Sequence, residues 1–150
     1  MANDRSPSLF ALTDDAAARS GDFIILFARL TMGALFLGPA WTGLSNVEGA
    51  AGYLASLGVP APTLMAWMAL LGELAIAIGL ILGVATRYVS LFTFVFLIIT
   101  IVLAHRYWVY PPGQQANQFA HFWKNIALMG GALMLFWSGA GRFSVDARMR

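Results

Sequence analysis

Cysteine is absent from this chain of 150 residues, and charged residues make up only 11% of it. Without cysteine, a disulfide framework, a thiolate metal site and a thiol-based redox relay are all excluded. Soluble domains contain about 25% charged residues, so the low charge argues against an ordinary soluble domain. The chain also lacks a cluster of lysine and arginine, and this argues against nucleic-acid binding.

Apolar residues, by contrast, make up 59% of the chain and gather in four long runs. A run of about 18 or more apolar residues is typical of a membrane-spanning helix. We therefore predict an all-α membrane protein, an antiparallel bundle of four transmembrane helices. The predicted spans are Phe23–Ala40, Leu64–Val84, Tyr88–Ala104 and Phe122–Ala140. The expected divisions are an N-terminal tail over 1–22, a membrane domain over 23–146 and a C-terminal tail over 147–150.

Arginine and lysine are distributed unequally between the two sides of the predicted bundle. Short loops rich in these residues stay in the cytoplasm. With the N-terminus inside, the inner side holds Arg5, Arg19, Arg87, Arg142, Arg148 and Arg150, and the outer side holds Arg106 and Lys124. The pattern predicts a multi-pass membrane protein with both termini in the cytoplasm. We expect its location to be the bacterial inner membrane.

The first predicted outer loop contains the signals of a short helix. Asn46 is a suitable N-cap, and apolar residues follow it at helical spacing as far as Leu57. Gly58 and Pro60 then prevent the helix from continuing. We predict an amphipathic helix lying on the outer membrane surface. An aromatic belt at the same interface is indicated by Tyr107, Trp108 and Tyr110.

Small residues recur every four residues in three of the predicted spans. The sets are Ala34 with Gly38, Ala75 with Gly79 and Gly83, and Ala127 with Gly131. Such stripes let helices approach closely in lipid, so they predict a compact bundle.

Two charges lie inside predicted spans. Glu73 is near the middle of Leu64–Gly83, and Arg29 is the only charge in Phe23–Ala40. Charges at this depth are costly, and they usually have a function and a partner. At about 1.5 Å per residue, Arg29 and Glu73 differ in depth by roughly 7 Å. We predict a buried Arg29–Glu73 pair, which either fixes helix register or belongs to the functional site.

A second polar group is expected at the outer rim. His105 ends the third span, and His121, Lys124 and Asn125 begin the fourth. Histidine can titrate near neutral pH, bind a metal or hydrogen-bond a carbonyl group. Two histidines without cysteine or a nearby carboxylate are a weak metal signal, so no metal is predicted. Contact with a polar ligand and capping of the interface remain open, with axial haem ligation a lesser alternative.

Taken in order, these elements resemble the DoxX/DoxD-like family of membrane proteins. The matching segments are Arg29–Gly33, Gly72–Ala75, Gly83–Arg87, His105, and Gly139–Asp146 with the pattern Gly-x-Gly-x-x-Ser-x-Asp. The resemblance covers Phe23 to Asp146. It implies the four-helix fold and places Arg29, Glu73 and His105 at the family's polar positions. The family includes the membrane subunit of thiosulfate:quinone oxidoreductase.

The resemblance and the polar residues together favour a quinone-linked oxidoreductase subunit. Its candidate catalytic residues are Glu73, as a proton relay, and Arg29. The candidate quinone-binding residues are His105, His121, Lys124, Asn125 and Trp67. The alternative is a non-catalytic assembly or accessory protein that stabilises or recruits a partner complex, and a small-solute or proton transporter ranks third. In each case we expect contact with the lipid bilayer and with a partner protein or a second copy of the chain.

Overall fold

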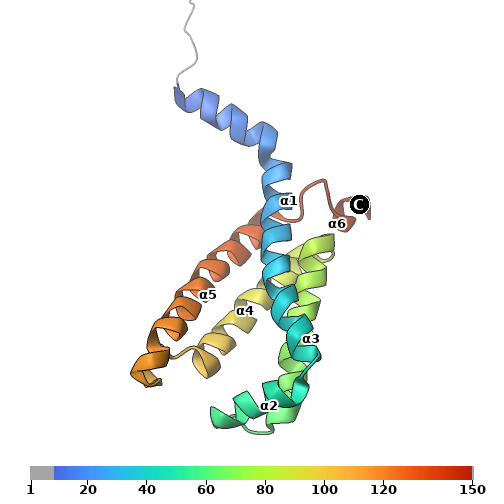
Figure 1. Cartoon of the computed structure of the whole chain (residues 1–150). Coiled ribbons are helices and arrows are strands. Elements are labelled where there is room, and N and C mark those ends of the chain that lie inside the picture. Colours follow the sequence, from blue (N-terminus) through green and yellow to red (C-terminus); the bar gives the residue numbers. More distant parts are fainter. Residues whose placement is uncertain (1–8, 150) are drawn as a thin grey trace, which may run out of the picture.

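The computed structural model describes residues 9–149, and these are almost entirely helical (Figure 1). The long helices are α1 (Leu9–Leu44), α3 (Pro62–Leu82), α4 (Thr86–Ala104) and α5 (Pro112–Ser138). The short ones are α2 (Val47–Ser56), the 3-10 helix η1 (Tyr107–Val109) and α6 (Val145–Arg148). The described residues contain no strand, so the predicted all-α class is confirmed.

Three segments have the length and composition of membrane spans, namely Ala11–Leu44, Pro62–Leu82 and Thr86–Val109. They correspond to the first three predicted spans. α5 is not among them, because its first half carries a series of polar residues: Gln114, Gln115, Asn117, Gln118, His121, Lys124 and Asn125. A fourth span over Phe122–Ala140 therefore stays a prediction.

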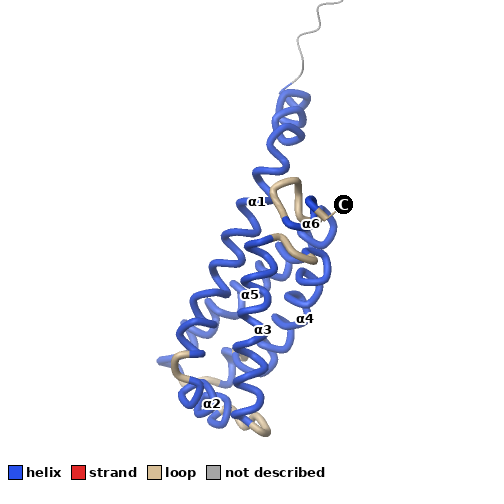
Figure 2. The backbone as a smooth tube through the Cα atoms, turned by 90° about the vertical axis from the view of Figure 1, so that its right-hand side faces the viewer, coloured by secondary structure: helices blue, strands red, loops and turns tan. Residues whose placement is uncertain are grey.

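The long helices pack as two pairs. α1 packs mainly against α3, α4 packs mainly against α5, and contacts between α3 and α4 join the pairs. Figure 2 shows these four helices running alongside one another, with the start of α1 projecting past α6. The predicted tail over 1–22 is thus helical where it is described, and residues 1–8 lie outside the described range.

The bundle has two chemically different ends. The histidine end comprises α2, η1 and the neighbouring His105 and His121. The arginine end comprises the Gly83–Ala85 turn between α3 and α4 and the segment Gly139–Arg148 that includes α6. Figure 1 has the histidine end at the bottom and the arginine end beside the α6 label.

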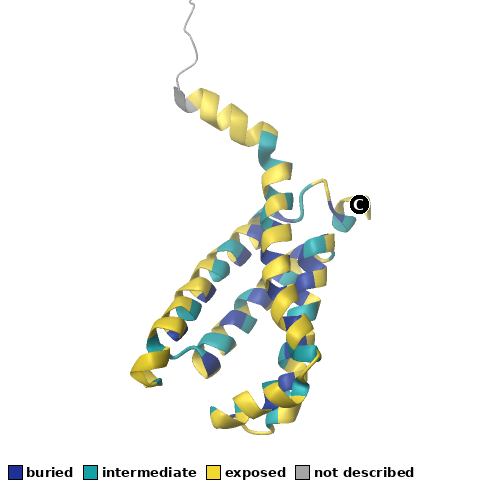
Figure 3. Ribbon diagram, in the orientation of Figure 1, coloured by how far each residue is buried: buried dark blue, intermediate teal, exposed yellow. Residues whose placement is uncertain are grey.

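Between the two ends, apolar side chains form the core. Its buried members are Met32, Phe36, Ile76, Ala77, Leu80, Leu97, Ala132 and Leu135. Figure 3 shows buried positions where the helices face one another and exposed positions around the outside. Large apolar side chains are common on that outside, for example Phe27 with 70% and Trp137 with 75% of the side chain exposed. An apolar exterior over helices that satisfy their own backbone hydrogen bonds suits a bilayer.

Glycine allows close helix approach at some of the predicted small-residue positions and not at others. Gly79 packs against Val89 of α4, so the stripe on α3 is confirmed there. The prediction of a close helix contact along Ala34 and Gly38 of α1 is wrong. Gly38 is exposed, and no atom lies within 4 Å of the position that a Cβ would take. The close contacts of α1 are instead at Gly33, which meets Ile81, and at Gly43.

α2 follows the predicted helix over 46–57. Asn46 is its N-cap, and the side-chain oxygen accepts a hydrogen bond from the Gly49 N–H at 3.0 Å. Gly58 follows the C-cap with a φ of 75°, a conformation that glycine adopts without strain. The helix and its N-cap are confirmed, and its amphipathic placement on a membrane surface stays a prediction.

Replacing Gly79 by alanine is expected to lower the free energy of unfolding by about 1–3 kcal/mol, as overpacking of a core does. A Cβ there would lie 2.7 Å from Cγ2 of Val89. The matched change Gly38→Ala, with nothing within 4 Å, is expected to be neutral or to stabilise by up to about 1 kcal/mol. Thermal unfolding in one detergent, followed by circular dichroism, measures both variants. Equal melting temperatures would show that α3 and α4 do not pack closely at Gly79.

Candidate functional site

Arg29 is fully buried at the arginine end. Its Nη2 donates a hydrogen bond of 2.6 Å to the carbonyl oxygen of Phe143, and its Nε and Nη1 have no hydrogen-bond partner among the described residues. The guanidinium lies directly against Gly83, where a Cβ would collide with it. Asp146 provides the favourable charge that acts on it. Arg29 therefore holds the C-terminal segment against the end of α3.

Asp146 also caps the start of α4. Its two carboxylate oxygens accept hydrogen bonds from the N–H groups of Ala85 at 2.6 Å and Thr86 at 2.8 Å. The Asp146 N–H in turn donates to the carbonyl oxygen of Gly83. Ala85 has a φ of 49°, a left-handed conformation that is unfavourable for alanine. These hydrogen bonds hold the tight α3–α4 turn in that conformation.

Two more arginines fasten the arginine end. Arg87 donates to the carbonyl oxygens of Phe136 and, at 3.0 Å, Trp137, which close the last turn of α5. A cation at a helix C-terminus also interacts favourably with the helix dipole. Arg142 pairs with Asp22 of α1 at 3.5 Å, and its backbone N–H donates to the same carboxylate at 2.9 Å. The matched residues of the resemblance at this end thus form one interlocked structure.

The predicted Arg29–Glu73 pair is wrong, since these two described residues make no ion pair. Arg29 is level with Gly83, and Glu73 lies ten residues earlier on the same helix, about 15 Å away at 1.5 Å per residue. The expected offset was too small because α1 runs beyond the bundle to Leu9, which places Arg29 at the bundle's end. The contacts of Arg29 are structural, and its catalytic role stays a prediction.

Glu73 is half-buried near the middle of α3. The charge that acts on it belongs to Lys124 of α5, although the two groups are too far apart for an ion pair. Asn125, the neighbour of Lys124, is buried with only 4% of its surface exposed. The charge of Lys124 thus acts on Glu73 from a distance, without a direct contact between α3 and α5 at these residues.

The two histidines meet at the histidine end, although 16 positions separate them in the sequence. Their rings stack with centroids 5.0 Å apart and planes inclined by 12°. His105 Nδ1 contacts Gln118 Oε1 at 2.8 Å, and Lys124 Nζ contacts His121 Nδ1 at 3.2 Å. The sequence prediction that the two histidines lie at one membrane level on adjacent helices agrees with this arrangement.

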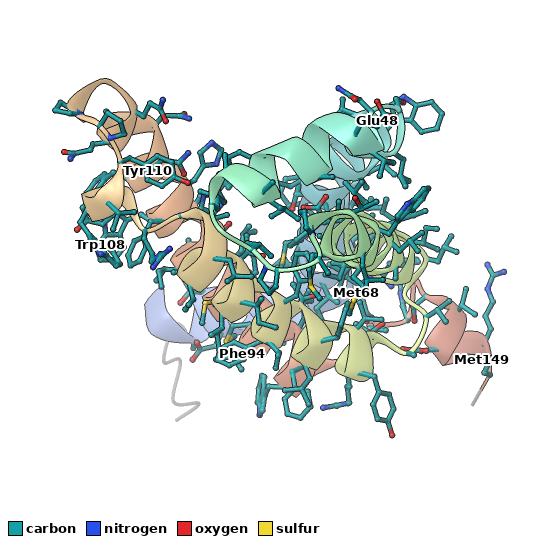
Figure 4. The ribbon with its side chains drawn as sticks, turned by 90° about the horizontal axis from the view of Figure 1, so that it is seen from below. Glu48, Met68, Phe94, Trp108, Tyr110 and Met149 are labelled. Carbon is teal, nitrogen blue, oxygen red and sulfur yellow. The ribbon has the colours of Figure 1, made fainter. Side chains whose placement is uncertain are left out.

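Two tyrosines complete the cluster. The Tyr110 hydroxyl donates to the Ala104 carbonyl at 2.8 Å and lies 3.1 Å from the Tyr53 hydroxyl of α2. Burial raises the pKa of the Tyr53 hydroxyl, and its hydrogen bond with Tyr110 raises it further. Tyr53 therefore stays neutral and remains a hydrogen-bond donor. Figure 4 views the molecule from this end and shows Tyr110 and Trp108 at the side opposite Met149.

We call Tyr53, His105, Tyr110, Gln118, His121 and Lys124 the histidine-end cluster. Sequence reasoning missed Tyr53 and Gln118 and interpreted Tyr110 only as an interfacial aromatic. The spacing of three residues between Gln118 and His121 on one helix face is a signal that could have found Gln118. Trp67 stays apart, since it is 45% exposed and no recorded contact joins it to the cluster.

Double-mutant cycles distinguish the two candidate partners of Arg29. Arg29→Gln and Asp146→Asn are each expected to destabilise the bundle, by about 3–5 kcal/mol where a buried charge loses its partner. In the double variant, the loss in free energy of unfolding should differ from the sum of the two single losses by about 0.5–3 kcal/mol. The losses caused by Arg29→Gln and Glu73→Gln should instead be additive within about 0.5 kcal/mol. Unfolding of the wild type, the three single variants and both double variants in detergent gives these energies. Coupling of Arg29 to Glu73 rather than to Asp146 would reinstate the original pair.

Comparison with known proteins agrees with the resemblance noted in the sequence. The family profile of DoxX matches residues 24–106. The chain is 32% identical over 135 residues to the inner membrane protein YphA of Escherichia coli (strain K12), covering 90% of this chain and 95% of that protein. It is 30% identical over 125 residues to the inner membrane protein YqjF of the same organism, covering 83% and 91%. No solved structure matches. The chain therefore belongs to the DoxX family.

Proposed function

We propose that this chain is the quinone-binding membrane subunit of an oxidoreductase and that the histidine-end cluster is its binding site. The names of the relatives YphA and YqjF support a place in the inner membrane. The observation that carries the proposal is the pair of stacked imidazoles at the end of helices with the length and composition of membrane spans. A quinone needs hydrogen-bonding groups at that depth beside an apolar wall.

α5 is the fourth span in this proposal. Its 27 residues extend about 40 Å at 1.5 Å per residue, enough to cross the hydrocarbon core of a bilayer. It packs along α4, which is itself apolar enough to span. The polar Gln118 and Asn125 are buried against the bundle, so they do not face lipid. These two polar residues of α5 thus line the protein interior, whereas Gln114, Asn117 and Lys124 are exposed.

The hydrogen bonds of the two imidazoles give them complementary roles. Lys124 is an ammonium group that only donates, so Nδ1 of His121 accepts and the proton of a neutral ring lies on Nε2. Gln118 Oε1 only accepts, so Nδ1 of His105 donates and Nε2 of a neutral ring is an acceptor. His121 Nε2–H can therefore donate to a carbonyl oxygen, and His105 Nε2 can accept from a hydroxyl group.

A bound quinone supplies two-electron, two-proton redox chemistry. The chain's own residues would hold its polar ring and exchange protons with it. Lys124 contacts His121, and its charge also acts on Glu73, so these two residues would supply protons to the imidazoles. The two electrons would come from, or pass to, a redox group on a partner protein. We keep Glu73 as the proposed proton relay and assign Arg29 to the structure of the arginine end.

His121→Phe tests the quinone site with little change of shape. Phenylalanine keeps the stacked ring but removes both nitrogen atoms, so one hydrogen bond to the quinone is lost. The affinity for a short-chain quinone, followed by quenching of tryptophan fluorescence in detergent, is expected to fall up to about tenfold. Gln114→Ala, at an exposed position of the same helix, is the matched control and should bind as the wild type does.

Two outcomes would contradict the quinone site. The first is wild-type protein that neither retains quinone on purification nor binds it when it is added. The second is equal affinity in the His121→Phe and Gln114→Ala variants. If the first outcome is found and a protein co-purifies in fixed proportion, the non-catalytic accessory role replaces the quinone-linked one.

Orientation can be tested because the chain has no cysteine of its own. The arginine end carries Arg87, Arg142 and Arg148, so we propose that it faces the cytoplasm. A single cysteine at the exposed Gln114 should react with an impermeant maleimide added outside the inner membrane. A cysteine at the exposed Ala147 should react only after the membrane is opened. The reverse pattern would invert the topology.

A further inference from the structure

The arginine end contains two adjoining pockets that the quinone proposal does not use. One has a volume of about 320 Å³, and its lining includes Arg87, the Gly139–Arg142 loop and Asp146. The other has a volume of about 330 Å³, and its lining includes Leu82, Arg142 and Arg148. Arg142 and Ser144 belong to both linings, so the two pockets flank one short stretch of chain.

Charges around these pockets do not balance. Asp146 caps α4 and faces the buried Arg29, and Asp22 pairs with Arg142. The two carboxylates thus compensate the positive charges of Arg29 and Arg142. Arg87 binds only neutral carbonyl oxygens, and Arg148 adds a further positive charge at the second pocket. The pockets together carry an excess of positive charge.

The surroundings have the character of a membrane interface. Next to Arg87, Tyr88 is 81% exposed, and Trp137, whose carbonyl Arg87 binds, is 75% exposed. Tyrosine and tryptophan are enriched at the level of lipid headgroups. The second pocket also reaches Leu82, the last residue of the apolar α3. A molecule in these pockets would contact both guanidinium groups and apolar surface.

We propose that the arginine end binds the phosphate group of an anionic glycerophospholipid. Guanidinium groups suit phosphate oxygens because they offer several N–H donors in a planar fork. Arg148 would hold the phosphate together with the Nη groups of Arg142, whose contact with Asp22 is made by Nε. The acyl chains would run along α3 beyond Leu82. The uncompensated positive charge favours a lipid with net negative charge over a zwitterionic one. Free phosphate offers the same oxygens but nothing for the apolar side of the site.

Lipid binding can be counted directly by native mass spectrometry of the full chain. Protein purified in detergent is mixed with phosphatidylglycerol or phosphatidylcholine, and bound lipids are counted. We expect wild type to retain phosphatidylglycerol in preference to phosphatidylcholine. Arg142→Gln and Arg148→Gln should each weaken this retention about fivefold, corresponding to about 1 kcal/mol per arginine near a lipid surface. Arg19→Gln, an exposed position on the projecting part of α1, should change nothing.

Three results would overturn the assignment. Equal retention of the two lipids would show that net charge does not select the ligand. Retention that falls equally in the Arg19→Gln variant would show only a general charge effect. Release of phosphatidylglycerol by excess inorganic phosphate, but not by chloride at equal ionic strength, would assign the site to free phosphate. Circular dichroism of each variant confirms that it remains helical, and the quinone-binding assay is independent of all these results.

Discussion

The fold depends on how the chain compensates the buried positive charge of Arg29. A guanidinium group cannot lose its proton in a protein, so a fully buried one needs hydrogen bonds and a counter-charge. The C-terminal segment supplies both, through the Phe143 carbonyl and through Asp146. Because the Asp146 carboxylate also caps α4, one short segment connects α1, α3 and α4. Displacing it would leave both a buried cation and an uncapped helix.

This fastening divides the bundle into a tightly connected end and a more open one. At the arginine end, backbone and charged groups bind one another directly. At the histidine end, α2 and the region of η1 meet through side chains, among them Tyr53 and Tyr110. Figure 1 shows the α4–α5 pair diverging from the α1–α3 pair toward the histidine end. The two helix pairs are thus joined more closely at the arginine end than at the histidine end.

Much of the helix pattern could be predicted from the sequence, because apolar runs and helix breakers act locally. Asn46 and Gly58 mark the ends of α2 in this way. The meeting of His105 and His121 was also predictable, since each lies near the same end of adjacent antiparallel helices. The partners of the intramembrane charges were not. Glu73 faces a lysine of α5 and Arg29 faces the segment before α6, and depth along one helix says nothing about such distant elements.

An apolar core separates the two polar regions of the molecule. Phe36, Ile76 and Leu97 are buried between the level of Arg29 and the histidine-end cluster. Charge interactions are strong at low dielectric but fall with distance, so each intramembrane charge is governed by its local partner. Glu73 and Arg29 can therefore have different roles in one small bundle. The carboxylate lies near the middle of α3, where the charge of Lys124 acts on it, whereas the guanidinium joins α1 to the C-terminal segment at the end of the bundle.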